Sequence, residues 1–473
     1  MAKSYDLVIL GGGTGGYVAA IRASQLGLKT AIVEKDKLGG TCLHRGCIPS
    51  KALLRTAEVF ATAKDGAKYG VLAQDITLDY KKAHERKNAI INQLHRGVTM
   101  LMKKGKIDVY NGYGRILGPS IFSPLSGTIS VEYEDGKEND ILIPDKLLIA
   151  TGSRPRSLPG LDVDGKLVLT SDDAVHLESL PASILIVGGG VIGVEWASLL
   201  NDLGVDVTVI EYAERIVPTE DEAISRELQK QLEKRGIRFV TKAKVLPETL
   251  QKGAGVTIEA EVNGEKQGFS ADQLLVSVGR LPNTEDIGLA NTNVKTEKGF
   301  ILVNDAYQTS ESHIYAIGDC IGGLQLAHVA SHEGIKAVEH IAGKHTGPLD
   351  ATLIPKCIYT RPEIASVGLT EKEARDQGYD VKVGKFSFNA IGKALVYGES
   401  DGFVKIVADK ATDDVLGVHM IGPHVTDMIS EAALARVLDA TPWEIAETVH
   451  PHPTLSEIIG EAALAVDGLA IHS

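Results

Sequence analysis

The sequence predicts an α/β protein that ends in a separate α+β domain. Three observations predict this architecture. A strand, a glycine cluster, a helix and a second strand follow one another over residues 5–34, and the same order returns over residues 183–211. From about Pro348 the chain changes to alternating apolar and polar segments. With 473 residues the chain is too long for one hydrophobic core, so we expect three or four domains.

The charge balance points away from nucleic acid. The chain has 62 acidic and 49 basic side chains and a net charge of -13, which disfavours nucleic acid or an anionic membrane as the main partner. Its first apolar run stops at glycines without a small-residue cleavage site, and no apolar stretch approaches the length of a membrane span. We therefore expect a cytosolic protein that works on small molecules or other proteins.

The first motif begins with YDLVIL, residues 5–10, a short apolar run typical of a buried parallel strand. It leads into Gly11, Gly13 and Gly16, an alanine-rich helix and a second strand that ends at Glu34. Glycines let the backbone approach a pyrophosphate, a helix N-terminus stabilises its charge, and an acidic residue accepts hydrogen bonds from ribose. A glycine triplet alone is weak evidence, but this order of elements predicts a Rossmann-like dinucleotide-binding fold.

The second motif repeats the first. SILIV, residues 183–187, leads into Gly188, Gly190 and Gly193, and the strand after the helix ends at Glu211. Two copies suggest two different nucleotides, because electrons can then pass from one cofactor to the other.

The acid at the end of the second motif favours one carrier. A carboxylate at the position of Glu211 favours an unphosphorylated ribose, so we expect NAD rather than NADP. Arg215 lies four residues beyond Glu211 and could serve a 2′-phosphate, but we interpret it as a solvated surface residue.

Three further segments are predicted to be strands that end in glycine turns. KLLIATG, residues 146–152, and QLLVSVG, residues 273–279, each follow a β-rich, turn-rich insert and are expected to close the two nucleotide-binding domains. In HIYAIGDC, residues 313–320, Asp319 stands at a strand's carboxyl end. It can bond a polyol such as the ribityl chain of a flavin, or it can be a helix N-cap.

The C-terminal part carries a histidine motif. CIYT, KVGKFSF, FVKIVAD and VLGVHMIG predict an antiparallel sheet, and DMISEAALARVLDA predicts a helix. In HPHPTLSE, the prolines exclude a regular helix through His450 and His452, and Glu457 opens the next helix. The two histidines are either surface residues or include a general base oriented by a carboxylate.

GGTCLHRGCIPSK holds Cys42 and Cys47, two of four cysteines. Four cysteines in a cytosolic chain form no disulfide framework, which disfavours a structural bridge. A zinc site needs about four clustered ligands, and His44 is the nearest extra donor, so metal binding is also disfavoured. Cys320 and Cys357 do not lie in a motif of this kind, and we expect them to be buried and chemically inert.

These motifs occur in one order over the full length, and together they resemble the flavin-dependent pyridine nucleotide disulfide oxidoreductases. The resemblance implies FAD in the first nucleotide fold and NAD in the second. It also implies oxidation of protein-bound dihydrolipoamide to lipoamide, with reduction of NAD to NADH, as part of 2-oxo acid dehydrogenase complexes. The implied domains are 1–148 for FAD, 149–274 for NAD, 275–348 completing the FAD site, and 349–473 for dimerisation.

The resemblance assigns a redox role to the cysteine pair. Residues five apart in an ideal helix are separated by about 7.5 Å along its axis, beyond the usual disulfide spacing. A bridge between Cys42 and Cys47 therefore requires a distorted turn, which Gly46 and Pro49 permit. A helix N-terminus also stabilises a thiolate. By resemblance, Cys47 lies beside the flavin and Cys42 exchanges with the substrate.

The remaining roles also follow from the resemblance. His452 is the base that takes a proton from dihydrolipoamide, and Glu457 orients it. Lys51 is expected near the flavin and paired with Glu195, although a surface lysine and an unrelated buried glutamate are the alternative. The expected FAD residues are Gly11, Gly13, Gly16, Glu34, Lys35, Gly40, Thr41, Lys51, Gly114, Thr151, Gly152, Asp319 and Ala327, and the expected NAD residues are Gly188, Gly190, Gly193, Glu211, Val245 and Gly279.

The resemblance further implies partners. We expect an obligate homodimer in which His452 and Glu457 complete the other subunit's site. We also expect docking to the lipoyl domain and subunit-binding domain of a dihydrolipoyl acyltransferase. The acidic surface can serve that docking or solubility alone.

One departure from the family and several other functions need weighing. His44 and Arg45 stand where the family commonly has Asn and Val, which predicts extra positive potential beside the cysteines.

Three other functions are disfavoured. Glutathione and trypanothione reductases prefer NADPH, which Glu211 disfavours, and mercuric reductases add a C-terminal cysteine pair that this sequence does not show. A non-catalytic flavoprotein scaffold is disfavoured because the cysteine pair and the His–Glu motif are both intact.

Overall fold

The computed structural model describes residues 2–119 and 126–472, and these form two compact units. The first unit comprises Met1–Ala52, Lys81–Arg156 and Gly279–Leu349, and the second comprises Leu53–Tyr80, Ser157–Val278 and Asp350–Ser473. None of the helices in these described ranges is long and apolar enough to cross a membrane.

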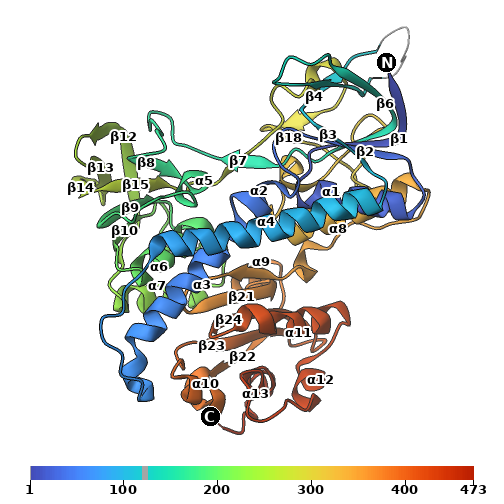
Figure 1. Ribbon diagram of the computed structural model, residues 1–473. Helices are drawn as coiled ribbons and strands as arrows, with labels where there is room; N and C mark the ends of the chain where they lie inside the picture. The colour runs from blue at the N-terminus through green and yellow to red at the C-terminus, as the bar shows by residue number, and fades with distance from the viewer. Residues whose placement is uncertain (1, 120–125, 473) are drawn as a thin grey trace. The chain divides into compact units, whose positions relative to one another are not determined.

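The first unit is built on a mixed sheet in the order β3-β2-β1-β6-β5-β4, with β19 paired to β6 (Figure 1). β1, β2, β3, β6 and β19 run parallel, and β4 and β5 add antiparallel pairs. β1 ends level with its neighbours, because Leu10 pairs with both Val33 and Ile149. The bounds are β1 Lys3–Leu10, β2 Thr30–Glu34, β3 Asp108–Asn111, β4 Tyr113–Leu117, β5 Thr128–Glu132, β6 Asp140–Ile149 and β19 Ile314–Ala316.

Two helices of the first unit pack closely through small residues. α1 (Thr14–Gln25) and α8 (Ala327–Ile341) meet where a Cβ on Gly334 would lie 2.8 Å from the carbonyl oxygen of Gly15. In the sheet, β1, β2, β6 and β19 run parallel, so their carboxyl ends lie at the same edge. The loops that follow these strands converge at that edge.

The insert before β6 differs in part from the prediction. Besides β3 to β5 it holds two long helices, α3 (Cys47–Lys64) and α4 (Tyr80–Lys104). On α4 the buried Ala83, Lys87 and Ile91 recur every four residues, which is a helical period. The sequence analysis did not predict α4, because many charged residues lie between its buried residues.

The second unit contains a parallel sheet in the order β11-β10-β9-β15-β8, followed along the chain by a C-terminal antiparallel sheet in the order β20-β21-β24-β23-β22. A three-stranded antiparallel sheet, β12-β13-β14, confirms the β-rich insert predicted before residue 273. The bounds are β8 Val168–Thr170, β9 Ser183–Val187, β10 Asp206–Ile210, β11 Arg238–Val240, β12 Ala243–Lys252, β13 Val256–Val262, β14 Glu265–Ala271, β15 Gln273–Val276, β20 Lys356–Ile358, β21 Glu363–Gly368, β22 Val381–Ser387, β23 Phe403–Asp409 and β24 Val415–Gly422.

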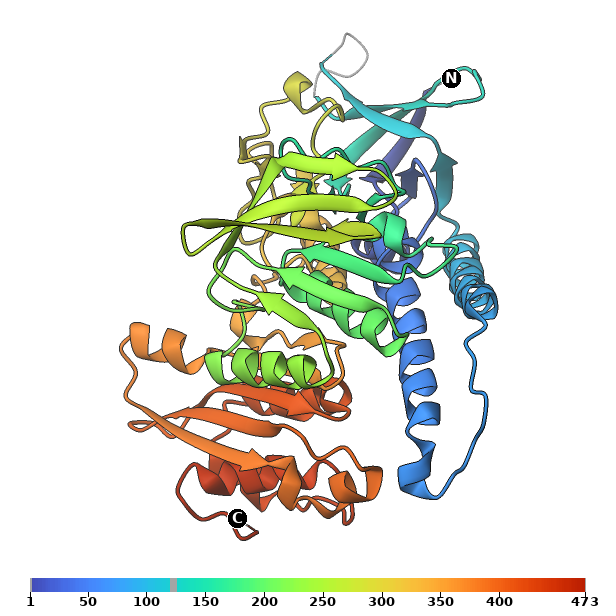
Figure 2. The ribbon, with the colours of Figure 1, turned by 90° about the vertical axis from the view of Figure 1, so that its left-hand side faces the viewer.

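The main helices of this unit are α6 (Val191–Asp202), α7 (Glu222–Lys234), α11 (Val425–Val437) and α13 (Glu457–Ala465). α7 lies against the C-terminal sheet, drawn orange to red in Figure 2. The shorter helices and strands of the chain are α2 Gly40–His44, α5 Ser171–Ala174, α9 Glu371–Asp376, α10 Gly392–Tyr397, α12 Pro442–Glu447, β7 Ser153–Pro155, β16 Arg280–Pro282, β17 Thr296–Glu297 and β18 Phe300–Ile301.

Buried charges join α7 to the C-terminal sheet. Lys405 Nζ on β23 lies 3.0 Å from both carboxylate oxygens of Asp221, the N-cap of α7. Ser366 on β21 donates to Glu220 at 2.7 Å. The predicted fold class, two Rossmann-like folds with a C-terminal α+β domain, is confirmed. The domain boundaries at 148, 274 and 348 stay a prediction.

Candidate active site

The two glycine loops have nearly the same backbone. Gly11 has φ +109° and Gly188 has φ +107°, and a Cβ on either would lie 2.3 Å or 2.4 Å from a backbone carbonyl oxygen. A Cβ on Gly16 or Gly193 would lie 1.9 Å from the carbonyl oxygen of Gly11 or Gly188. The outer glycines are therefore required by close backbone packing, the first against the end of a neighbouring strand and the last against the first glycine of its own loop.

The middle glycines differ, because they leave open space. Gly13 and Gly190 are the N-caps of α1 and α6, and a Cβ added to either would meet nothing within 4 Å. Each therefore leaves room beside a helix N-terminus whose N–H groups favour an anion. This arrangement fits the pyrophosphate of a dinucleotide in both loops.

Each glycine loop is tied to the predicted acid at the end of the next strand. Glu34 accepts the Gly12 N–H at 2.7 Å, and Glu211 accepts the Gly189 N–H. The second oxygen of each carboxylate accepts the N–H two residues further along, at 2.8 Å and 2.6 Å respectively. The two loops thus place a carboxylate in the same position relative to the glycines.

The contacts of Arg215 contradict its interpretation as a solvated surface residue. Its guanidinium donates at 2.8 Å to the carbonyl oxygens of Pro218 and Glu220, and the side chain is half-buried. It therefore holds the loop after β10 and is not a solvated surface residue. A sequence pattern gives no signal for such side-chain to backbone contacts.

The cysteine pair lies on a broken helix, as predicted. α2 ends at His44 and α3 begins at Cys47. Gly39 and Gly40 precede the pair with φ of +106° and +57°, and a Cβ on Gly40 would lie 2.6 Å from Gly13 Cα. The turn that carries the cysteines is therefore seated directly on the first glycine loop.

Cys42 and Cys47 are both in the thiol form, which is the reduced form of the predicted bridge. The hydrogen bond between them, together with burial, raises the pKa of Cys42, while Thr14 and Lys51 oppose that rise. Within residues 2–119 and 126–472, no group of three or more His, Cys, Asp or Glu side chains is arranged to hold a metal ion.

The other two cysteines have different settings. Cys320 is fully buried, donates to the Ile317 carbonyl at 3.1 Å, and has its pKa raised to about 12 by burial. Cys357 is half-buried rather than buried, and burial raises its pKa to about 11. Neither thiol ionises readily near neutral pH.

Asp319 lies one residue inside a short 3-10 helix, Gly318–Ile321, whose N-cap is Ile317, so the N-cap alternative is wrong. Its carboxylate accepts the Ser153 hydroxyl and lies 3.8 Å from Arg280 Nε. Arg280 also donates to the Ser153 hydroxyl at 2.6 Å. Ser153 and Arg280 were missed by sequence reasoning, because no motif marks them.

The remaining predicted cofactor residues occupy varied positions. Gly114 lies on β4, where a Cβ would be 2.3 Å from Leu10 Cδ1, so its small size also serves packing. Lys35 Nζ lies 6.0 Å from the ring centroid of Tyr113. Thr41 is in α2, Thr151 and Gly152 follow β6, Ala327 opens α8, Val245 is on β12, and Gly279 precedes β16 with φ +104°. Their cofactor contacts stay predictions.

The two histidines of HPHP have different partners. His452 Nδ1 lies 2.8 Å from Glu457 Oε1, and its side chain is 77% exposed. His450 Nε2 lies 2.7 Å from Glu431 and packs against Gly460, with a 9% exposed side chain. His452 is therefore the accessible histidine with an oriented ring, and His450 is structural.

Glu457 is held as a carboxylate. Partial burial disfavours its charge, but hydrogen bonds from His452 and from the Thr454 N–H at 2.9 Å outweigh burial and lower its pKa. An ionised Glu457 favours an Nδ1–H tautomer of His452, which leaves a lone pair on Nε2 that can accept a proton.

Glu195 is buried on α6 and accepts the Tyr359 N–H at 2.9 Å. Lys51 belongs to the first unit and Glu195 to the second. Their pairing stays a prediction.

Two dinucleotide-binding folds, a thiol pair on the first glycine loop and an exposed His–carboxylate pair define an oxidoreductase that uses dinucleotides to act on sulfur. Known proteins narrow the class. The family described as "Pyridine nucleotide-disulphide oxidoreductase" matches residues 5–334, and its "dimerisation domain" matches residues 354–463. The chain therefore belongs to the pyridine nucleotide-disulphide oxidoreductase family, uses FAD and NAD(H), and is a homodimer.

Individual relatives extend over the whole chain. The dihydrolipoyl dehydrogenase of Bacillus subtilis (strain 168) is 69% identical over 473 residues, which is 100% of both chains. The mitochondrial dihydrolipoyl dehydrogenase of Pisum sativum is 43% identical and covers 99% of this chain and 92% of its own. The crystal structure of LpdA from Mycobacterium tuberculosis aligns with a TM-score of 0.89 at 28% identity, over 97% of this chain and 98% of that chain.

Proposed function

We propose that this protein oxidises dihydrolipoamide to lipoamide and reduces NAD to NADH. The full-length 69% identity to a dihydrolipoyl dehydrogenase carries the choice of substrate. The seating of the Cys42–Cys47 turn on the first glycine loop supports the chemistry, because it brings a thiol pair to the cradle of a dinucleotide.

The sulfur half of the reaction begins with the oxidised Cys42–Cys47 bridge. His452 Nε2 takes a proton from one substrate thiol, and the resulting thiolate attacks Cys42 Sγ. A mixed disulfide forms and Cys47 leaves as a thiolate. The second substrate sulfur, after losing its proton, attacks the first and releases Cys42. The substrate loses two electrons, and the protein pair gains them as the two reduced thiols described above.

The chain's own residues set up the second half. The first glycine loop and Glu34 would hold FAD, with Asp319 available to accept a ribityl hydroxyl, and the second loop with Glu211 would hold NAD. When bound, FAD would supply an acceptor for the electron pair of the dithiol and NAD an acceptor for hydride. The Glu211 carboxylate disfavours a 2′-phosphate, which selects NAD over NADP.

The partners follow from the same assignment. His452 and Glu457 serve the thiol pair of the other subunit, so each homodimer carries two shared sites. The physiological substrate is a lipoyl domain of a dihydrolipoyl acyltransferase, whose subunit-binding domain anchors the dimer in a cytoplasmic 2-oxo acid dehydrogenase complex.

The test uses purified holoenzyme in three assays. It is given dihydrolipoamide with NAD, dihydrolipoamide with NADP, and glutathione disulfide with NADPH. We expect rapid NADH formation in the first and little turnover in the others. Preference for glutathione disulfide and NADPH would contradict the substrate assignment, and equal rates with NAD and NADP would contradict the role of Glu211.

A further inference from the structure

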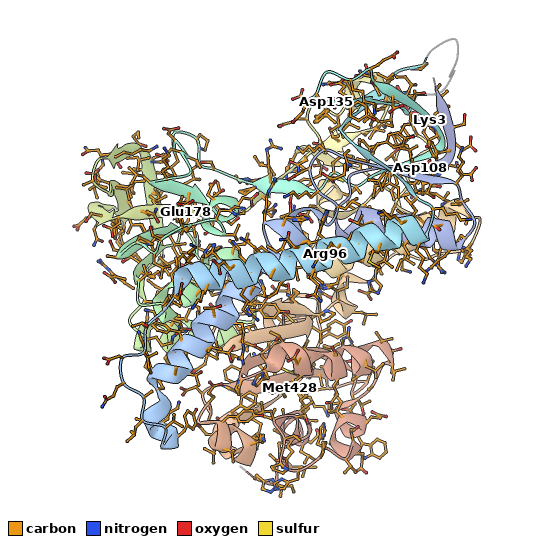
Figure 3. The ribbon with its side chains drawn as sticks, in the orientation of Figure 1. Lys3, Arg96, Asp108, Asp135, Glu178 and Met428 are labelled. Atoms are coloured by element: carbon orange, nitrogen blue, oxygen red, sulfur yellow. The ribbon has the colours of Figure 1, made fainter. Side chains whose placement is uncertain are left out.

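Two histidines beside the thiol pair share one hydrogen-bond acceptor. His44 Nε2 lies 2.9 Å from the Leu38 carbonyl oxygen, and His95 Nδ1 lies 3.0 Å from the same atom. The two rings meet edge to face with centroids 5.3 Å apart. His44 lies on α2 with Cys42, and His95 lies on α4 immediately before Arg96, which Figure 3 labels.

The shared acceptor fixes the tautomers. A carbonyl oxygen carries no proton, so both ring nitrogens that face it must donate. Neutral His44 is therefore protonated at Nε2, and neutral His95 at Nδ1. An additional proton binds the other nitrogen of either ring and leaves both hydrogen bonds to Leu38 intact. Acidification thus adds charge without releasing the contact.

The Leu38 carbonyl marks the entry to the thiol turn. Leu38 is buried and is followed by Gly39 and Gly40, whose positive φ values turn the chain into α2. Since Gly40 rests on Gly13, the position of Leu38 determines how the turn sits on the glycine loop. Two donors on one carbonyl, one of them from α4, restrain that position.

The charges around His44 are balanced. Arg45 forms an ion pair with Asp36, which partly offsets the positive charge of Arg45. Burial lowers the pKa of His44, with His95 and Lys37 contributing, against the favourable effects of the Leu38 carbonyl and Asp36. Burial therefore favours the neutral form of His44, and the predicted positive potential beside the cysteines stays a prediction.

We propose that His44 and His95 are positioning residues that hold the thiol turn through the Leu38 carbonyl, and that on acidification they take up one shared proton that favours the thiolate of the Cys42–Cys47 pair. Two imidazolium ions 5.3 Å apart repel, which limits the uptake to one proton. A stabilised thiolate makes the reduced pair more stable and the couple more oxidising below neutral pH. This inference rests on the proposed redox role of the pair.

Matched variants separate position from charge. The side-chain amide of His44→Gln places a donor near Nε2, and that of His95→Asn places one near Nδ1, so these variants keep the hydrogen bonds and lose the titration. His44→Ala and His95→Ala lose both. His345→Gln, at an exposed histidine of the first unit, is the control.

The measurement is the rate at which iodoacetamide alkylates Cys42 and Cys47 in reduced holoenzyme between pH 5.5 and 8.5, resolved by mass spectrometry. We expect the amide variants to match the unsubstituted protein at pH 8 and to react about threefold more slowly at pH 6. The alanine variants should differ at every pH, because the turn moves.

Each half of the proposal can fail separately. A pH profile of His44→Gln and His95→Asn that matches the unsubstituted protein would overturn the charge coupling. Unchanged rates in soluble alanine variants would overturn the positioning role. If those variants fail to fold, the double variant His44→Gln/His95→Asn replaces them, and rates at pH 8 that differ from those of the unsubstituted protein would overturn the role, because this variant keeps both hydrogen bonds to Leu38. Thiols that label normally but never reoxidise with lipoamide would refute the proposed function instead.

Discussion

At the scale of single residues, the site depends on which of two neighbouring histidines is free to act. His450 and His452 both contact a glutamate, but only His452 presents its ring to solvent. Sequence reasoning left the two readings open, because prolines fix backbone direction and do not reveal exposure. Exposure separates the two side chains, and the role of His452 as the base stays a prediction.

We expect His452→Gln to lower kcat for dihydrolipoamide oxidation by about 10²–10⁴-fold, because a general base contributes that much. Glu457→Gln should cost a smaller factor, since the ring stays in place without its charged partner. Steady-state NADH formation measures both. His450→Gln is the control: it should reduce stability and leave kcat little changed, and a kcat loss equal to that of His452→Gln would contradict the assignment.

A second residue-scale prediction concerns Glu333 on α8. This buried side chain accepts the Gly318 N–H at 2.7 Å, and burial, with a contribution from Asp319, raises its pKa to about 7 from 4.5. The folded protein binds this proton more tightly than the unfolded chain. The contribution of Glu333 to the free energy of unfolding is therefore greatest below pH 4.5, the pKa in the unfolded chain, and it is lost as the pH rises towards 7.

Glu333→Gln removes that loss while keeping an acceptor for Gly318. We expect it to raise the free energy of unfolding by roughly 1–3 kcal/mol at pH 8 and by much less at pH 5. Urea denaturation at the two pH values measures the difference. An equal effect at both would show that the carboxyl group does not titrate in this range.

At the scale of elements, the sequence predicted both glycine loops, the strands around them and the break between α2 and α3. These features are local, because each follows from residues within about 30 positions. The sequence did not predict the contact of Gly40 with Gly13, the Ser153–Arg280–Asp319 cluster or the shared Leu38 carbonyl. The cluster and the bond from His95 to Leu38 join segments distant along the chain, and the contact of Gly40 with Gly13 depends on how two nearby turns pack, so neither composition nor periodicity encodes them.

The glycine loop yields a matched pair of variants. Gly13→Ala places a methyl group in open space, whereas Gly16→Ala places one 1.9 Å from the Gly11 carbonyl oxygen. We expect Gly13→Ala to fold normally and to weaken FAD binding by about tenfold or more, because the methyl group enters the pyrophosphate site. Gly16→Ala should lower the melting temperature even without FAD.

Fluorescence titration of apoprotein with FAD, together with thermal unfolding of the same samples, measures both effects. Unaltered FAD affinity in Gly13→Ala would place the pyrophosphate elsewhere. Gly190→Ala offers the same test for NAD through its KM.

At the scale of the whole molecule, the protein is a homodimer, and the proposed site needs groups from both chains. The sequence predicted the order of the folds. It did not reveal the buried Lys405–Asp221 contact that ties α7 to the C-terminal sheet, because those residues lie 184 positions apart and each looks like an ordinary surface charge.

Mixed dimers test the shared site. A dimer of one Cys47→Ser chain and one His452→Gln chain has one complete site if the histidine serves the other subunit, and none if it serves its own. We expect doubly tagged mixed dimers to recover about half of the unsubstituted rate. Each homodimeric variant measured alone is the control, and mixed dimers as inactive as those would place the base within a single chain.

The close approach of Gly40 to Gly13 leaves no room for adjustment. A protein engineer who wishes to retune the sulfur pair by shifting its backbone must shift the cofactor cradle as well, because even one methyl group cannot be inserted between them. Substitutions that alter charge around the turn are therefore the practical route to a new redox potential.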